Sequence, residues 1–178
     1  MKLLKWLLTV LLLMGVALMG GLLLPGNSHL QRSVVIERPP AEVFAALNSF
    51  QRFTEWSPWS DLDRDAIYTY SGPLTGVGAK MAWTGNSSIG SGSQQIIKST
   101  PDRSIVNALD VGGSQATAGY LLVAESSGTR VTWSMDSAHG YNPVKRWFGA
   151  LLLDRVVGKD YEKGLAKLKS VLESGPRR

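Results

Sequence analysis

The sequence predicts an α+β domain in which a curved antiparallel sheet wraps around one long C-terminal helix, with one transmembrane helix before the domain. Three observations predict this fold. The segment Trp6–Leu24 carries no charge and is mostly apolar. Turn residues then recur about every ten residues between strand-like runs, which is typical of antiparallel hairpins. From Pro143 to about Leu172 the apolar residues follow a helical period. Because one amphipathic helix cannot cover both faces of a flat sheet, a sheet curved around the helix buries the apolar surfaces of both.

The apolar N-terminal segment has the length of a membrane span. As a helix, Trp6–Leu24 would cover about 28 Å, close to the roughly 30 Å hydrocarbon core of a bilayer. Lys2 and Lys5 precede it and favour a cytoplasmic N-terminus with the domain exported. A cleaved signal peptide is the alternative, because the small residues Gly26 and Ser28 resemble a cleavage site. The apolar run exceeds the roughly 7–15 residues usual in signal peptides, which favours an uncleaved anchor. By elimination, we expect a bacterial inner membrane with the domain in the periplasm.

Composition shifts divide the chain into four parts. They are an anchor or uncleaved signal sequence at 1–25, a polar linker at 26–32, a domain at 33–173 and a polar tail at 174–178. Within the domain, the patterns predict strands at 33–38, 66–70, 79–84, 94–99, 104–110, 116–125 and 129–136. They predict helices at 41–47, 50–56 and 143–172.

Composition also excludes several classes of function. The chain has no cysteine, which rules out disulfides, thiolate catalysis and thiolate metal sites. Its net charge of +5 is too small to indicate a nucleic-acid partner, and Lys2 and Lys5 contribute part of it. Asp61, Asp63 and Asp65 alternate, but they lack the glycine and closing glutamate of a calcium loop. We therefore expect no metal, no cofactor and no nucleic acid, and the oligomeric state stays open.

Four short segments carry a family resemblance. Val34–Phe44 leads from a strand into Pro-Ala-Glu-Val-Phe, and Phe53–Trp59 contains Phe-x-x-Trp-Ser-Pro-Trp. Gly76–Ala79 leads to Trp83, and Gly158–Lys169 forms the end of the domain. In this order and spacing, the segments resemble the SRPBCC superfamily, in its START-like, polyketide cyclase/dehydrase branch. The resemblance covers about residues 33–173.

The resemblance implies a helix-grip fold with a deep apolar cavity. Members of the superfamily bind lipids, sterols, quinones or polyketides, and a minority are enzymes. The resemblance implies no single reaction, because the superfamily has no shared catalytic motif.

Aromatic and methionine side chains are the candidate ligand contacts. Met81 and Trp83 share one face of a predicted strand, and Trp133 and Met135 share one face of another. Such faces line a cavity if they point toward the helix, and plain core packing is the alternative. We predict a ligand-binding surface of Trp56, Trp59, Tyr68, Tyr70, Met81, Trp83, Tyr120, Trp133, Met135, Phe148 and Leu152.

Three further features have two interpretations each. Phe53, Trp56 and Trp59 lie near the short helices, either at the mouth of the cavity or as an apolar plug. The helix glycines Gly149, Gly158 and Gly164 either open space or allow close approach. A basic face of the last helix is either solvated or in contact with anionic lipids. It comprises Lys145, Arg146, Arg155, Lys159, Lys163, Lys167 and Lys169.

The first functional hypothesis is a membrane-tethered protein that binds a hydrophobic small molecule, such as a lipid or quinone, without catalysis. The second is a polyketide cyclase or dehydrase in which Tyr68, Tyr70, Tyr120 or His139 moves protons. His139 follows Asp136 closely, and a histidine near a carboxylate can act as a base. The sequence places no clear acid/base pair, which favours the binding hypothesis. A ligand-free interaction module of the cell envelope is the third possibility.

Overall fold

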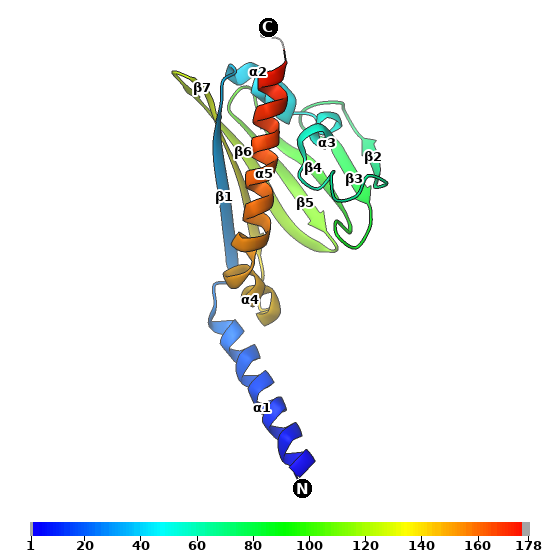
Figure 1. The fold of residues 1–178 in the computed structure, drawn as a ribbon, viewed down its shortest axis with the longest axis vertical. Helices are drawn as coiled ribbons and strands as arrows, with labels where there is room; N and C mark the ends of the chain where they lie inside the picture. The colour runs from blue at the N-terminus through cyan, green and yellow to red at the C-terminus, as the bar shows by residue number, and fades with distance from the viewer. Residues whose placement is uncertain (1, 176–178) are drawn as a thin grey trace.

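The computed structural model describes residues 2–175 and shows an α+β domain standing on one N-terminal helix (Figure 1). That helix, α1 (Lys2–Leu23), projects away from the domain. The strands are β1 (Asn27–Ile36), β2 (Ile67–Ser71), β3 (Lys80–Thr84), β4 (Ser91–Thr100), β5 (Ser104–Val111), β6 (Ser114–Glu125) and β7 (Gly128–Ala138). The remaining helices are α2 (Pro40–Leu47), the 3-10 turn η1 (Phe50–Arg52), α3 (Phe53–Trp56), α4 (Pro143–Leu151) and α5 (Leu153–Ser174).

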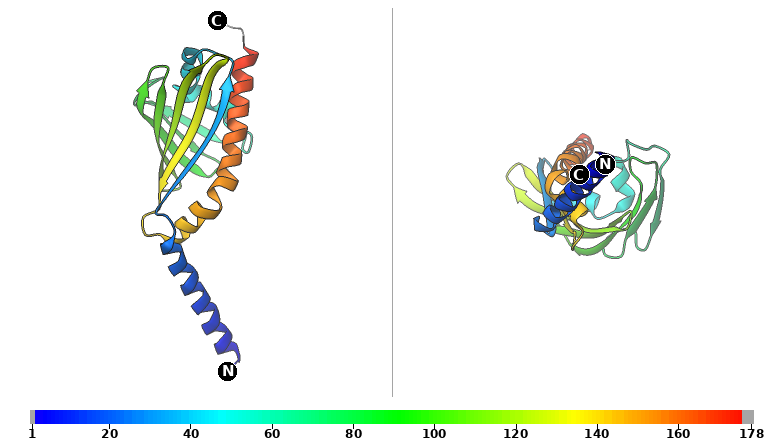
Figure 2. Two further views of the ribbon diagram at one scale, coloured as in Figure 1. Left: turned by 90° about the vertical axis from the view of Figure 1, so that its left-hand side faces the viewer. Right: turned by 90° about the horizontal axis from the view of Figure 1, so that it is seen from below.

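The strands form one antiparallel sheet in the order β1-β7-β6-β5-β4-β3-β2. Every neighbouring pair except β1 with β7 is consecutive in the chain, so the sheet is a series of hairpins closed by the first strand. Figure 2 shows the sheet curving around α5, which lies along its concave side. The predicted fold class and its helix-grip arrangement are thereby confirmed.

The segment expected to be a linker, residues 26–32, is a strand from Asn27 onward. β1 pairs with β7 over its whole length, from Asn27 opposite Ala138 to Ile36 opposite Thr129. Leu30 in this segment is buried in the core. The prediction of a linker was wrong. The polar residues of this segment indicate a loop by composition, but pairing with β7 supplies the backbone hydrogen bonds that make a polar strand stable.

The single helix expected over residues 143–172 is two helices, α4 and α5, that meet at Leu152. Leu152 has φ −115° and ψ −28°, and this φ lies well away from the value of about −63° that is usual in an α-helix. α5 lies under the sheet, whereas α4 turns aside to pack on α1 (Figure 2). The sequence concealed the break because both helices share apolar residues with similar spacing. Of the predicted polar tail, Ser174 belongs to α5, and residues 176–178 lie outside the described part of the chain.

The core lies between α5 and the concave face of the sheet. Leu165 and Leu168 of α5 are buried in one apolar cluster with Val131 of β7 and Ile36 of β1. The far end of α5 is held by the buried side chain of Arg38, which follows β1. Its guanidinium donates hydrogen bonds to the carbonyl oxygens of Glu173 (2.9 Å) and Gly175 (2.7 Å). These bonds satisfy carbonyls that a helix end leaves free, so they fix α5 along the sheet.

The helix glycines allow close approach. A β-carbon at Gly164 would lie 2.9 Å from Cζ3 of Trp133 and 3.0 Å from Cδ of Pro58. One at Gly158 would lie 2.5 Å from Nη2 of Arg32, and one at Gly149 would collide with Ser28 and His139. Of the two interpretations of these glycines, the structure supports close packing.

Replacing Gly164 with alanine is expected to destabilise the domain, although alanine favours a helix by about 1 kcal/mol. The new methyl group meets a buried indole ring and a proline, and such overpacking costs about 1–3 kcal/mol. The matched control is Gly158→Ala on the same helix, where the obstacle is the end of the Arg32 side chain, which can shift. Urea unfolding of both variants measures the difference. Equal stability changes at the two positions would contradict the packing role of Gly164.

Candidate functional site

A cavity of about 620 Å³ lies between the concave face of the sheet and the helices. Its size falls within the range of about 300–1,000 Å³ that is usual for small-molecule sites. Its wall is predominantly apolar, with Tyr120 and Trp133 from the sheet and Val157 and Tyr161 from α5. A second hollow of about 700 Å³ lies on the outer face of the sheet, lined by polar residues such as His29, Lys80 and Asp136. We regard the inner cavity as the candidate site, because it combines an apolar wall with a few polar groups.

Most of the predicted contact residues line this cavity. The structure brings together Trp59, Tyr68, Met81, Trp83, Tyr120, Trp133, Met135 and Phe148. Strand alternation and register explain the arrangement, since Tyr68 lies opposite Trp83, and Tyr120 lies opposite Trp133. Side chains at directly opposite positions share one face of a sheet. That these residues contact a ligand stays a prediction.

Three of the predicted contact residues do not line the cavity. Trp56 is buried in the core, with its ring edge-on to those of Tyr120 and Trp133. Tyr70 is 42% exposed near the end of the edge strand β2. Leu152 is 46% exposed at the junction between α4 and α5, where the turn of the chain carries it out of the cavity wall.

Sequence reasoning also missed several lining residues. They include Ser57, Gln94, Leu109, Val111, Ala116, Ala118, Val144, Leu153, Val157 and Tyr161. The helical period of α5 already placed Val157 and Tyr161 on its apolar face, so this signal was available. Gln94 carried no such signal, because only the sheet register places it on the concave face, opposite Met81 and Leu109.

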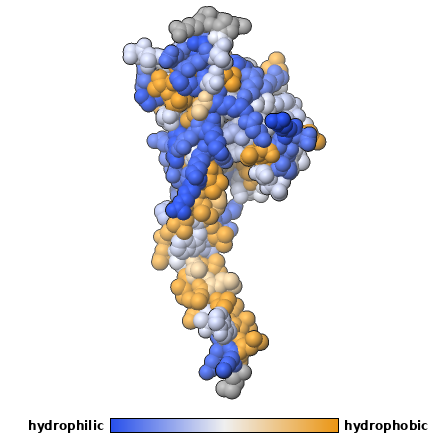
Figure 3. Space-filling view, viewed as in Figure 1, coloured by the Kyte–Doolittle hydropathy of each residue, from blue (hydrophilic) through white to orange (hydrophobic). Residues whose placement is uncertain are grey.

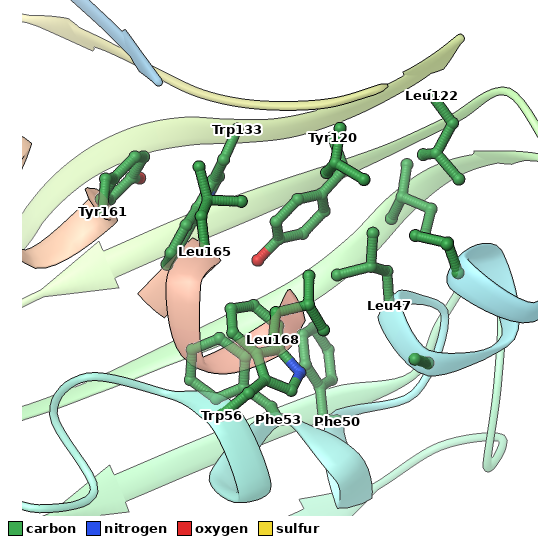
Figure 4. Close-up of a cluster of buried hydrophobic side chains, with 14 of the residues drawn as sticks. Leu47, Phe50, Phe53, Trp56, Tyr120, Leu122, Trp133, Tyr161, Leu165 and Leu168 are labelled. Carbon is green, nitrogen blue, oxygen red and sulfur yellow. The ribbon is translucent and has the colours of Figure 1, made fainter. Parts of the chain in front are cut away.

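An aromatic cluster forms the closed end of the cavity, and Figure 4 shows Tyr120, Trp133 and Tyr161 of this cluster among the buried side chains. The rings of Trp133 and Tyr161 stack with centroids 3.7 Å apart, and Tyr120 lies 5.5 Å from Trp133 on the other side. Trp59 contacts both Trp133 and Tyr161 edge-on. Phe53 and Trp56 are buried beside them, so the short helices plug this end rather than form an open mouth.

The closed end contains polar groups in apolar surroundings. Burial raises the pKa of the Tyr120 and Tyr161 hydroxyls, so both stay protonated at neutral pH. Nε1 of Trp133 is buried and has no hydrogen-bond partner within residues 2–175. Because an indole N–H only donates, an oxygen of a bound molecule would satisfy it. The closed end therefore suits an apolar ligand that carries a hydrogen-bond acceptor.

Exposure of the lining residues increases toward the opposite end. Val111 at the end of β5 is 44% exposed, and Val144 and Phe148 of α4 are 64% and 41% exposed. The Lys145 ammonium donates to Ser114 Oγ across this end at 3.2 Å. The cavity therefore opens between α4 and the β5–β6 turn.

His139 does not lie beside Asp136, as its place in the sequence suggested. Asp136 accepts from Nδ1 of His29 at 2.7 Å, on the outer face of the sheet. His139 instead lies 2.7 Å from Ser28 Oγ and lines the cavity near its open end. The prediction that placed Asp136 beside His139 was wrong because neighbours along a strand point to opposite faces, and the pairing of β1 with β7 brings His29 to Asp136.

The two histidines are expected to titrate on opposite sides of pH 6.5. The hydrogen bond to Asp136, with a smaller contribution from Gln31, raises the pKa of His29. Burial, with Lys145 and Arg146 nearby, lowers the pKa of His139. The stability that His29 contributes is present at low pH and is lost as pH rises through its folded pKa. The stability linked to His139 is lost in the other direction, as pH falls from about 6.5 through its folded pKa.

These are the only histidines in the chain, so an NMR titration of the ring protons resolves both. The variant Asp136→Asn is the control, because it should return the pKa of His29 toward 6.5 and leave that of His139 in place. Coincident titrations in the unmodified protein would contradict the assignment.

Several of the acidic and basic residues singled out in the sequence have structural partners. Asp61 pairs with Lys167 at 2.8 Å, and Asp63 accepts from the backbone N–H groups of Asp65 and Asn86. Lys169 pairs with Glu173. Within residues 2–175, no three His, Asp or Glu side chains converge as a metal site would require.

A family model described as "Polyketide cyclase / dehydrase and lipid transport" matches residues 28–173. The chain belongs to this family. The predicted resemblance is thereby confirmed, and the match begins inside β1, where the structure also begins the domain. As a member of the polyketide cyclase/dehydrase and lipid transport family, the chain contains a domain of a type suited to hydrophobic ligands. No curated protein matches this chain.

Solved structures share the fold of this family member at low sequence identity. Protein CV1439 from Chromobacterium violaceum and the Aha1 dimer from Colwellia psychrerythraea each give a TM-score of 0.61, with 14% and 16% identity. Each alignment covers 83% of this chain, and 99% and 97% of the two structures. The KanY protein gives a TM-score of 0.63 at 17% identity, covering 84% of this chain and 100% of that one. Identities this low show the fold alone.

Proposed function

We propose that this protein is a membrane-tethered binding protein that holds a hydrophobic small molecule, such as a lipid or quinone, in the cavity between the sheet and the helices. The observation that carries the proposal is an apolar cavity of ligand size whose wall is built from aromatic, methionine and aliphatic side chains. Methionine and aromatic side chains suit irregular apolar ligands, because they are polarizable and adapt their packing. The proposal needs no covalent chemistry.

The tether is the second part of the proposal. α1 is 22 residues long and contains an 18-residue stretch with a mean hydropathy of 2.3, so it is long and apolar enough to cross a membrane. A signal sequence meets the same criteria. Retention of α1 in the mature protein is supported by its packing, since the side chain of Arg146 donates to the carbonyl oxygens of Leu22 (2.6 Å) and Leu24 (3.1 Å). A tether would raise the concentration of the domain around ligands that partition into the bilayer.

Extraction of the purified full-length protein tests the function directly. The protein is isolated from membranes in mild detergent, extracted with organic solvent, and the extract is analysed by mass spectrometry. A stoichiometric apolar compound is the expected result, and it would name the ligand class. A second aliquot is titrated with an environment-sensitive apolar dye. An empty protein that also fails to bind the dye would contradict the proposal and favour a ligand-free interaction module.

The same extract distinguishes a carrier from a cyclase or dehydrase. A carrier releases the compound unchanged after incubation, whereas an enzyme converts it, with a pH dependence set by its acid or base. Burial keeps the Tyr120 hydroxyl protonated, so it favours a role for this group as a hydrogen-bond donor to the ligand.

A further inference from the structure

We propose that the open end of the cavity is seated in the interface of the bilayer that α1 crosses, so that the cavity opens onto lipid rather than water. We use the word rim for the exposed apolar residues at this open end and directly beside it, which are Val111, Val144, Phe148 and Leu151. The inference rests on the proposed tether and adds where the domain stands and how a ligand enters. The partner is the surface of a lipid bilayer.

The first observation is that α4, which carries most of the rim, packs directly on α1. A β-carbon at Gly21 would lie 2.8 Å from both Pro143 and Trp147, so the glycine creates a notch for α4. Arg146 adds its hydrogen bonds to the last carbonyls of α1. A packed glycine notch and satisfied helix-end carbonyls together hold α4 at a defined height on α1.

The second observation is the height of α4 relative to the hydrocarbon core of the membrane. α1 is about 33 Å long, close to the roughly 30 Å of the hydrocarbon core, so its last residue, Leu23, would lie near the core boundary. Nε1 of Trp147 donates to the carbonyl of Ala17 at 2.8 Å. Ala17 lies about 9 Å before Leu23 along the helix axis. Trp147 therefore reaches to or below the core boundary, which places α4 at the interface, where tryptophan is enriched.

The third observation is the chemistry of the exposed surface at this height. Val144 and Leu151 of α4 are 64% and 57% exposed, and Val111 stands beside the open end on the β5–β6 side. Figure 3 shows the apolar surface of α1 continuing onto the lower end of the domain, beneath a mainly hydrophilic upper part. The exposed side chains of Lys145 and Arg155 flank these residues, and basic groups at this level attract anionic lipid headgroups.

Together these observations indicate which end of the cavity faces the membrane. Its closed end contains the aromatic cluster, far from α1, and its rim lies where α1 leaves the membrane. An apolar molecule could then pass between bilayer and cavity without crossing water, which avoids the cost of hydrating its apolar surface.

The test uses the absence of cysteine in the natural chain. Single-cysteine variants of the full-length protein carry a fluorophore at Val144, Val111 or Leu12, in nanodiscs of phosphatidylethanolamine and phosphatidylglycerol. Val123 on β6 is the matched control, because it is the same residue type and is 48% exposed at the other end of the sheet. Leu151 provides a second reporter on α4 outside the cavity lining. Circular dichroism of each variant confirms folding.

Quenching by nitroxide lipids is compared with quenching by aqueous iodide. We expect lipid quenching several-fold stronger at Val144, Val111 and Leu151 than at Val123, and the strongest protection from iodide at Leu12. If lipids quench the label at Leu12 but quench the rim labels no more than the label at Val123, the inference about the rim is overturned and the tether stands. Water exposure at Leu12 would overturn both. The extraction experiment is independent of these readings, so failure of ligand binding is recognised separately.

A charge placed on the rim supplies a second test. Leu151→Asp should weaken lipid quenching of the Val111 label across the open end, because a carboxylate resists the apolar interface. Leu151→Ala, which removes bulk without adding charge, should reduce it less. An Asp variant with unchanged quenching would count against a seated rim.

Discussion

Replacing Trp133 with alanine is expected to lower the free energy of unfolding of the domain by about 3–5 kcal/mol. Trp133 is 2% exposed and stacks on Tyr161 at a centroid distance of 3.7 Å. It also packs edge-on against Trp56 and Trp59, so its removal disrupts the contacts of a whole cluster. The loss is a large part of the roughly 5–15 kcal/mol that a typical domain possesses. Urea unfolding followed by far-ultraviolet circular dichroism measures it.

Trp147→Ala is the matched control for this prediction. Trp147 packs against α1 at Gly20 and Gly21 and lies outside the core. Its replacement should change the stability of the domain by no more than about 0.5 kcal/mol, the range typical of surface positions. Comparable losses in the two variants would show that the cluster around Trp133 is not the centre of stability.

Replacing Met135 with glutamate is expected to weaken retention of the bound molecule by at least about 100-fold, or roughly 2.7 kcal/mol. Met135 lines the cavity and is only partly buried, so the domain should still fold. An ionised carboxylate facing an apolar ligand must lose water without gaining a partner, which costs several kcal/mol. Mass spectrometry of extracts from equal amounts of folded protein gives the ligand occupancy.

Met135→Leu keeps an apolar side chain of similar size and should retain the ligand. The pH offers an internal check on the glutamate variant, since protonation of the new carboxyl at low pH should restore part of the binding. Full occupancy of the glutamate variant at neutral pH would show that the ligand, if any, lies elsewhere.

The sequence by itself predicted the order of the strands and, for several strands and the last helix, which residues share a face. Turn residues at regular spacing marked the hairpins, and alternation placed Met81 with Trp83 and Trp133 with Met135 on common faces. The helical period placed Val157 and Tyr161 on the inner face of α5. These signals are local, because each depends on residues within one strand or helix, and the physical preferences that produce them act at short range.

Only the tertiary structure decided the features that depend on pairing across the chain. Asn27–Arg32 became a strand because β7 offered a partner, and Asp136 met His29 because of that same pairing. The chain bends at Leu152 between α4 and α5, and α4 packs on α1, where Trp147 meets Ala17 from a distant part of the chain. The direction in which the cavity opens also depends on where α4 packs. Local patterns place side chains on a face, but which face meets which is determined by contacts between distant segments, and these depend on the fold as a whole.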